Sequence, residues 1–110
     1  MQLQGLYAVT DEVLTPYDKI EESVDAAIKG GIRVIQLRDK HTSDAELYRV
    51  GVKIKKLCEQ HNVIFLVDDR VVLAKALKAD GVHIGTNDVS IGVAREIIGE
   101  KKIIGVSCYG

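Results

Sequence analysis

Two aspartates in the sequence each follow a short apolar run. Asp69 comes after the run Val63 to Val67, and Asp88 comes after the run Val82 to Ile84. If these runs are neighbouring parallel strands, they lie about 4.8 Å apart, so both carboxylates could reach one cation. Magnesium prefers such oxygens and usually takes one or two protein carboxylates, with water and substrate phosphate completing its shell. Asp69 and Asp88 are therefore candidate Mg²⁺ ligands.

A dense polar block follows another apolar run. It extends from Gln36 to Lys40 and reads Gln36, Leu37, Arg38, Asp39, Lys40. Its amide and cationic donors suit a diphosphate and a heteroaromatic ring. Ser107 adds a hydroxyl after a further apolar run. The block therefore predicts a site for a phosphorylated small molecule.

Both groups of residues also have structural interpretations. Aspartate commonly caps a helix, and Asp68 or Asp69 precedes a helix expected to begin near Val71. Arg38 and Lys40 beside a carboxylate could form solvated pairs worth less than about 1 kcal/mol. These alternatives remain open at the level of single residues.

Five short apolar runs are expected to be strands. They do not alternate apolar with polar residues, which is typical of parallel strands covered on both faces. The runs are Leu6 to Val9, Val34 to Leu37, Val63 to Val67, Val82 to Ile84 and Ile103 to Val106.

Helical periodicity separates these strands. A stripe from Ile20 to Ile28 ends at Gly30-Gly31, where a positive φ can close the helix. Ser43 to Glu46 has the pattern of a capping box for a second helix. Val71 to Lys78 and Ile91 to Ile98, the latter capped by Ser90, complete four helices. The alternating order predicts a parallel sheet with right-handed crossovers.

Two architectures have this order: an open doubly wound sheet and an eight-stranded barrel. The open sheet binds its ligand at one switch point, whereas a barrel gathers polar residues from the ends of many consecutive strands. Polar or small residues follow every predicted strand here. We therefore predict an α/β fold, a partial TIM (β/α)8 barrel with its first five parallel strands and four connecting helices, forming one domain over residues 1–110.

Composition excludes several classes of function. Fifteen basic and sixteen acidic residues give a net charge of -1 without a basic block, so nucleic acid is not an expected partner. No run of about 18 apolar residues predicts a membrane span. Cys58 and Cys108 lack the spacing of a zinc site and are expected to be reduced thiols, with Cys58 in the core. We expect a cytoplasmic protein.

Several of these motifs together resemble the thiamine phosphate synthase family. They occur in the family's order, and the resemblance extends over the whole chain. The motifs are Leu6 to Asp11, Ile35 to Lys40, Asp68-Asp69-Arg70, Asp80 to Gly85 and Ile104 to Ser107.

The resemblance implies a TIM barrel that joins hydroxymethylpyrimidine diphosphate to thiazole phosphate, forming thiamine phosphate and diphosphate. It implies Mg²⁺ on Asp69 and Asp88, and pyrimidine diphosphate bound by Gln36, Leu37, Arg38, Asp39, Lys40, Asp68 and Ser107. No protein nucleophile is required. The family usually has asparagine in place of Asp68 and often glutamine in place of Thr86. At residue 68 this replaces an amide that can donate a hydrogen bond by a carboxylate that only accepts.

The family has three more strands than this sequence supplies, and by resemblance those strands carry the thiazole phosphate site. We therefore expect an N-terminal portion of a longer barrel, inactive alone, with unpaired edges at its first and fifth strands that could cause self-association.

Three other interpretations compete with the synthase. A thiazole tautomerase of the same fold would need neither metal nor diphosphate, so the Asp69 and Asp88 pair separates it from the synthase. A signalling receiver does not fit, because it would place its acidic pair after the first strand, with an acceptor aspartate ending a later strand and a Lys-Pro beyond, and this chain has neither. A non-catalytic fragment would act only with a complementary half of the barrel.

Overall fold

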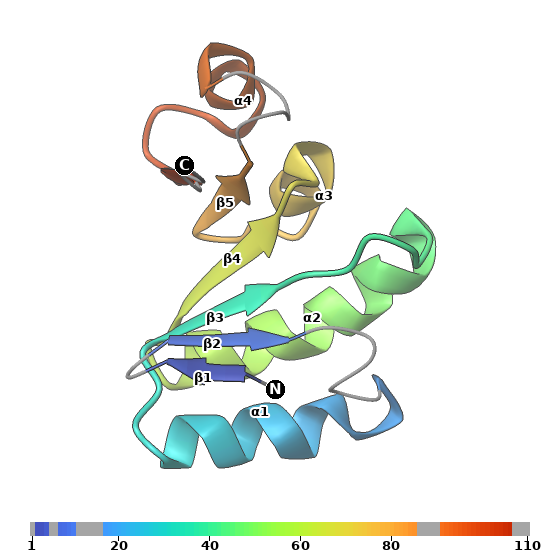
Figure 1. Cartoon of the computed structure of the whole chain (residues 1–110), viewed down its shortest axis with the longest axis vertical. Helices are drawn as coiled ribbons and strands as arrows, with labels where there is room; N and C mark the ends of the chain where they lie inside the picture. Colours follow the sequence, from blue (N-terminus) through green and yellow to red (C-terminus); the bar gives the residue numbers. More distant parts are fainter. Residues whose placement is uncertain (1, 5–6, 11–16, 86–90, 107–110) are drawn as a thin grey trace.

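The computed structural model describes residues 2–4, 7–10, 17–85 and 91–106. Within these ranges, the chain forms a six-stranded sheet with its helices packed against it (Figure 1). Five strands are parallel and pair in chain order, which confirms the predicted α/β fold. They are β2 (Tyr7–Thr10), β3 (Val34–Leu37), β4 (Ile64–Asp68), β5 (Gly81–Ile84) and β6 (Ile103–Val106).

Four α-helices connect the parallel strands. They are α1 (Ile20–Lys29), preceded by the 3₁₀ turn η1 (Tyr17–Lys19), then α2 (Asp44–Gln60), α3 (Val71–Ala76) and α4 (Ile91–Ile98). The predicted cap of α2 is confirmed, because the Ser43 hydroxyl accepts a hydrogen bond from the Glu46 amide at 3.3 Å. Gly31 has φ 98°, as expected for the residue that turns the chain out of α1. Ser90, the predicted cap of α4, lies outside the described residues.

The strand order distinguishes a barrel from a doubly wound sheet. Each parallel strand lies beside the one before it in the chain, from β2 to β6, so the sheet grows in a single direction. A doubly wound sheet would reverse this direction at a switch point. Right-handed crossovers in one direction place all helices on one face, and α1 and α2 do lie on the same side of β2 and β3 (Figure 1). The chain is therefore part of a parallel barrel.

The two faces of the sheet differ in chemistry. Apart from the fully buried Thr10, the side chains that point toward the helices are apolar, and the buried ones form one core with the helix stripes. Alternate residues point to the other face, called here the inner face, which includes Tyr7, Gln36, Asp68 and His83. The helix-facing residues are Ala8, Ile35, Leu37, Phe65, Val67, Val82 and Ile84.

An additional strand corrects one expectation. The strand β1 (Gln2–Gln4) pairs antiparallel with β2, so the first parallel strand is not left unpaired. Three residues give too weak a pattern to predict a strand, and β1 forms because the edge of β2 offers free backbone hydrogen-bonding groups. On the other side, β6 is the edge of the described sheet. Self-association through that edge stays a prediction.

Two further expectations concern single features of the chain. Cys58 is a free thiol in the core, as predicted, and burial, assisted by nearby Asp80, raises its pKa to about 12. Such a thiol stays protonated and unreactive. Among the described helices, none has the length and apolar content needed to cross a membrane.

Candidate functional site

The parallel strands all end at one edge of the sheet, called here the carboxyl edge. Because β3 and β4 are neighbours, this edge brings the Gln36 to Lys40 block beside Asp68, the last residue of β4. The Arg38 Nε lies 4.0 Å from Asp68 Oδ2, and their side chains are 47% and 11% exposed. An ion pair this open contributes little to stability. The guanidinium is therefore accessible to an anion beside a more buried carboxylate.

Gln36 has an unusual environment. The residue is only 5% exposed, and its Nε2 has no hydrogen-bond partner among the described residues. Its backbone carbonyl accepts a hydrogen bond from the Thr10 hydroxyl at 3.3 Å. Leaving a buried amide donor unpaired costs about 1–3 kcal/mol, so such groups in native proteins require an explanation. A ligand acceptor on the inner face would satisfy this donor.

Asp69 sits in a strained turn between β4 and α3. Its φ is 64°, a left-handed conformation that is uncommon for residues other than glycine. Its backbone amide donates to the His83 carbonyl of β5 at 2.7 Å, and its carbonyl accepts from the Val71 amide at 3.1 Å. The N-cap position of α3 belongs to Arg70, so neither Asp68 nor Asp69 occupies it. Strained backbone of this kind often occurs at functional sites.

Asp39 differs from Arg38 and Lys40, the charged residues on either side of it, because its side chain is fully buried. Its carboxylate accepts hydrogen bonds from the Tyr17 hydroxyl at 2.5 Å and from the backbone amides of His41 and Thr42, each at 2.8 Å. Burial alone would raise the pKa of this carboxyl, but the hydrogen bonds from Thr42, Tyr17 and His41 outweigh it and lower the pKa to about 2. Asp39 therefore organises the loop from inside.

Of the other residues in the Gln36 to Lys40 block, Leu37 is buried and Lys40 lies at the surface. Leu37 is fully buried in the core, so only its backbone is available to a ligand. Lys40 is exposed. Asp88 and Ser107, the second predicted Mg²⁺ ligand and the predicted hydroxyl, lie outside the described residues. Whether they join Asp69 and the Gln36 to Lys40 block stays a prediction.

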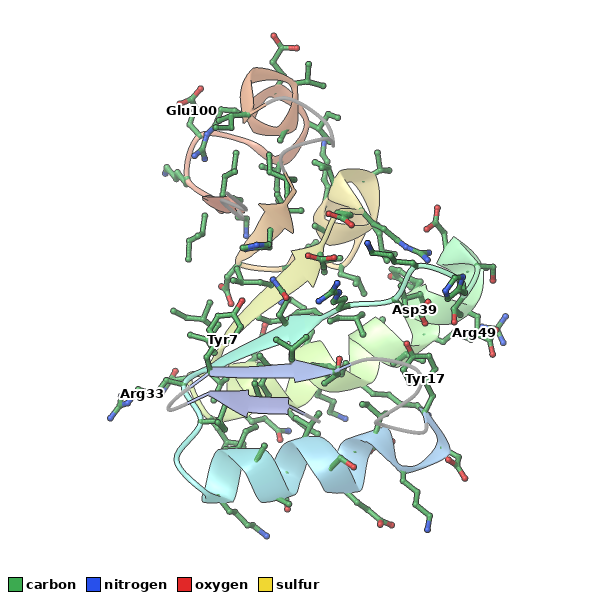
Figure 2. All side chains as sticks on the ribbon, in the orientation of Figure 1. Tyr7, Tyr17, Arg33, Asp39, Arg49 and Glu100 are labelled. Carbon is green, nitrogen blue, oxygen red and sulfur yellow. The ribbon has the colours of Figure 1, made fainter. Side chains whose placement is uncertain are left out.

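The structure adds residues that motif analysis did not select. Burial raises the pKa of Tyr7, and the nearby Asp68 carboxylate raises it further. Tyr7 lies on the side of β2 away from α1 (Figure 2). His83 pairs in register with Asp68, and Gly105 leaves room for its ring, because a Cβ there would lie 2.8 Å from His83 Nδ1. Strand alternation combined with register would have placed Tyr7 and His83 on the inner face.

Of the two predicted Mg²⁺ ligands, Asp69 is the one that lies among the described residues. Among the described residues, there is no cluster of three or more His, Cys, Asp or Glu side chains that could hold a metal. Mg²⁺ does not require one, since it commonly keeps water and phosphate oxygens beside one or two carboxylates. Asp69, with its oxygen donors at the carboxyl edge, fits such a ligand set.

A cavity of about 300 Å³ lies at the opposite edge of the sheet, called here the amino edge. Cys58, Val63, Phe65 and Asp80 are among the residues around it, at the end of α2 and the beginnings of β4 and β5. It is remote from the residues discussed above, because parallel strands separate the two edges. We therefore assign the candidate site to the carboxyl edge.

Consecutive parallel strands, helices on one face and polar side chains at the carboxyl edge define a (β/α) barrel with its site at the usual end. The family model described as thiamine monophosphate synthase matches residues 6–110. The chain belongs to this family, as its motifs indicated.

Relatives and a solved structure agree with this assignment. The chain is 41% identical over 109 residues to the thiamine-phosphate synthase of Alcanivorax borkumensis, covering 99% of this chain and 50% of that protein. It is 45% identical over 103 residues to the Persephonella marina enzyme of the same name, covering 94% and 49%. The structure of thiamine phosphate pyrophosphorylase from Pyrococcus furiosus superposes with a TM-score of 0.79 at 36% identity, covering 94% and 49%. The chain spans about half the length of these relatives.

Proposed function

We propose that this chain supplies the pyrimidine diphosphate and Mg²⁺ half of a thiamine phosphate synthase active site. The observation that carries the proposal is the buried amide of Gln36, whose Nε2 has no partner among the described residues. It lies on the strand next to the Asp68 strand, with the exposed Arg38 guanidinium at the end of its own strand. A ligand with a heteroaromatic acceptor and an anionic group would satisfy both.

The reaction breaks the bond between the pyrimidine methylene carbon and a diphosphate oxygen, and the electron pair leaves with diphosphate. The thiazole nitrogen then forms a bond to that carbon, so no protein nucleophile is needed. Arg38 and Lys40 bind the diphosphate and balance its growing negative charge, while Gln36 orients the pyrimidine. When bound to Asp69 and Asp88, Mg²⁺ would supply further positive charge for the leaving group.

Asp68 and Ser107 complete the proposed pyrimidine diphosphate site, Asp68 beside Arg38 and Ser107 after β6. The thiazole phosphate site is proposed to lie in the part of the relatives that this chain does not match. We also propose a cytoplasmic location, which the buried free thiol of Cys58 supports.

Calorimetric titration tests the proposal with the chain itself. We expect hydroxymethylpyrimidine diphosphate to bind only when Mg²⁺ is present, and thiazole phosphate not to bind. The variant Asp69→Asn should no longer bind hydroxymethylpyrimidine diphosphate when Mg²⁺ is present, while its circular dichroism spectrum is unchanged. Lys55→Met, at the amino edge, is the matched control and should bind as the unaltered chain does.

The rival functions give other results. A thiazole tautomerase would bind thiazole phosphate without Mg²⁺. A fragment that is active only with a complementary half would bind neither compound until that half is added. Binding of the pyrimidine diphosphate that is unaffected by Mg²⁺ or by Asp69→Asn would rule out the proposed metal assignment.

A further inference from the structure

The guanidinium of Arg70 connects two loops at the carboxyl edge. Arg70 follows Asp69 in the turn between β4 and α3, and its side chain is 19% exposed. Its Nη2 donates to the Asp39 carbonyl at 2.9 Å, and its Nη1 donates to Asp44 Oδ1 at 2.8 Å. Asp39 and Asp44 flank the connection from β3 to α2. Arg70 therefore holds both ends of the loop that contains Lys40.

The loop is also closed from within. Asp39 Oδ1 accepts hydrogen bonds from the amides of His41 and Thr42 at 2.8 Å each. Asp39 Oδ2 accepts a hydrogen bond from the Tyr17 hydroxyl of η1. Tyr17 and Asp39 lie at the same end of the molecule (Figure 2). The Arg70 Nη2 lies 3.9 Å from Asp39 Oδ1, so its charge also faces this carboxylate. Loop and turn thus form one hydrogen-bonded unit.

These contacts leave Arg70 poorly suited to bind a phosphate directly. Two of its donors are engaged by the protein, and most of the side chain is buried. The guanidinium fork can hold a carbonyl and a carboxylate at the same time, which a lysine ammonium cannot do with the same geometry. Its position in the sequence, directly after two aspartates, gives no sign of this role.

We propose that Arg70 is a positioning residue that fixes the Lys40 loop relative to the Asp69 turn, so that the diphosphate-binding and cation-binding groups of the site act together. This inference rests on the proposed function. It extends that function by assigning Arg70 an indirect role through Asp39 and Asp44, with no contact to ligand. Preorganisation of this kind raises affinity, because the loop does not have to be ordered on binding.

The test uses the full chain and inorganic diphosphate with Mg²⁺ as the probe. Calorimetry measures affinity, and amide hydrogen exchange of His41 and Thr42 measures loop order. Arg70→Met should weaken binding at least tenfold and speed exchange at both amides. Arg70→Lys should recover only part of either effect. Asp44→Ala, which removes a partner whose side chain is 78% exposed, should change affinity less than threefold, since the bond to Asp39 remains.

Two arginine variants provide matched controls. Arg95 also binds loop carbonyls, those of Gly99, Glu100 and Lys102, but between α4 and β6. Arg95→Met should therefore leave the diphosphate affinity and the His41 and Thr42 exchange unchanged. Arg38→Met removes a proposed direct ligand, so it should weaken binding without speeding exchange at these amides.

Each alternative result has a defined meaning. Weaker binding by Arg70→Met with unchanged amide exchange would make Arg70 a direct ligand and overturn the inference. Faster exchange with unchanged affinity would overturn it as well, leaving Arg70 a purely structural residue. Failure of the unaltered chain to bind both inorganic diphosphate and hydroxymethylpyrimidine diphosphate in the presence of Mg²⁺ would reject the proposed function itself and the inference with it.

Discussion

Residues with positive φ occur at both edges of the sheet, but in different structural settings. At the amino edge, Asn62 and Lys78 have φ of 56° and 54°, directly after α2 and α3. Hydrogen bonds from Val63 to Cys58 at 2.9 Å and from Ala79 to Ala74 at 3.0 Å show that both are ordinary helix ends. At the carboxyl edge, Asp69 has φ 64° at the start of a helix, where no such motif requires it.

Polar groups at the two edges differ in the same way. At the amino edge, the Asp80 carboxylate accepts a hydrogen bond from the Phe65 amide at 2.8 Å and joins β4 to the start of β5. At the carboxyl edge, Gln36 Nε2 has no partner among the described residues. The Asp80 carboxylate is therefore satisfied within the fold, whereas the carboxyl edge, beside its internally bonded Asp39 and Arg70, keeps one buried donor without a partner among the described residues. This separation is typical of barrels, in which one end stabilises and the other binds.

The largest expected effect comes from Asp39, whose carboxylate accepts three hydrogen bonds at the carboxyl edge. Asp39→Ala removes the acceptor of three hydrogen bonds and leaves the His41 and Thr42 amides without it. The free energy of unfolding should fall by about 3 kcal/mol, as measured by urea denaturation. A change below 1 kcal/mol would mean that the loop does not depend on this carboxylate.

Lowering the pH should remove the stabilisation that the Asp39 carboxylate gives to the fold. The Asp39 pKa of about 2 in the folded chain lies below its ordinary value of 3.8, so the carboxylate stabilises the fold above pH 3.8. As pH falls from about 4 to 2, about 2 kcal/mol of stability should be lost through this group. Denaturation across this range should show a smaller loss in Asp39→Asn, since that variant cannot titrate.

At the amino edge, Asp80→Ala should lower the free energy of unfolding by about 1.5 kcal/mol, because the buried Phe65 amide loses its partner. Binding of Mg²⁺ and diphosphate should be unchanged in calorimetry. Glu59→Ala is the control at the same edge. It removes only the pair with Lys55, in which the Glu59 side chain is 74% exposed, and should leave the free energy of unfolding nearly unchanged. Loss of diphosphate binding in Asp80→Ala would contradict the separation of the two edges.

Gln36→Met is expected to stabilise the fold, whereas Asp39→Ala and Asp80→Ala are expected to destabilise it. Replacing an amide that has no partner among the described residues by an apolar side chain of similar volume should raise the free energy of unfolding by about 1 kcal/mol. Affinity for hydroxymethylpyrimidine diphosphate should fall about tenfold, as expected when one hydrogen bond to the ligand is lost. Thermal denaturation and calorimetry measure the two effects. A destabilised variant would show that the Gln36 amide is already satisfied in solution.

The smallest expected effect is the change in stability when glycine replaces Asp69 or Lys78, two residues with a left-handed backbone conformation. Asp69→Gly and Lys78→Gly should each raise the free energy of unfolding by up to about 1 kcal/mol, because glycine adopts positive φ without strain. Only Asp69→Gly should lose Mg²⁺ binding. Equal Mg²⁺ binding by the two variants would remove the distinction between these positions.

The sequence predicted the fold closely where the signal is local. Three observed elements match the predicted ranges: Val34–Leu37, Ile103–Val106 and Ile91–Ile98. The third helix begins at Val71 as predicted but ends at Ala76 and not at Lys78. The strand β1 was missed because three residues carry no periodicity. The alternative of a solvated Arg38 pair is partly correct, since that side chain is about half exposed.

By itself, the sequence determined which residues lie at the strand ends, because apolar runs and helix stripes fix the alternation of elements. Only the tertiary structure decided which of those residues bind other parts of the protein and which remain available to a ligand. The Asp39 carboxylate binds amides of its own loop, Arg70 connects two loops, and the buried Gln36 Nε2 has no partner in the part of the chain that the structure describes. These roles depend on contacts between segments up to 31 residues apart, and the types of residue in a motif do not encode such distances.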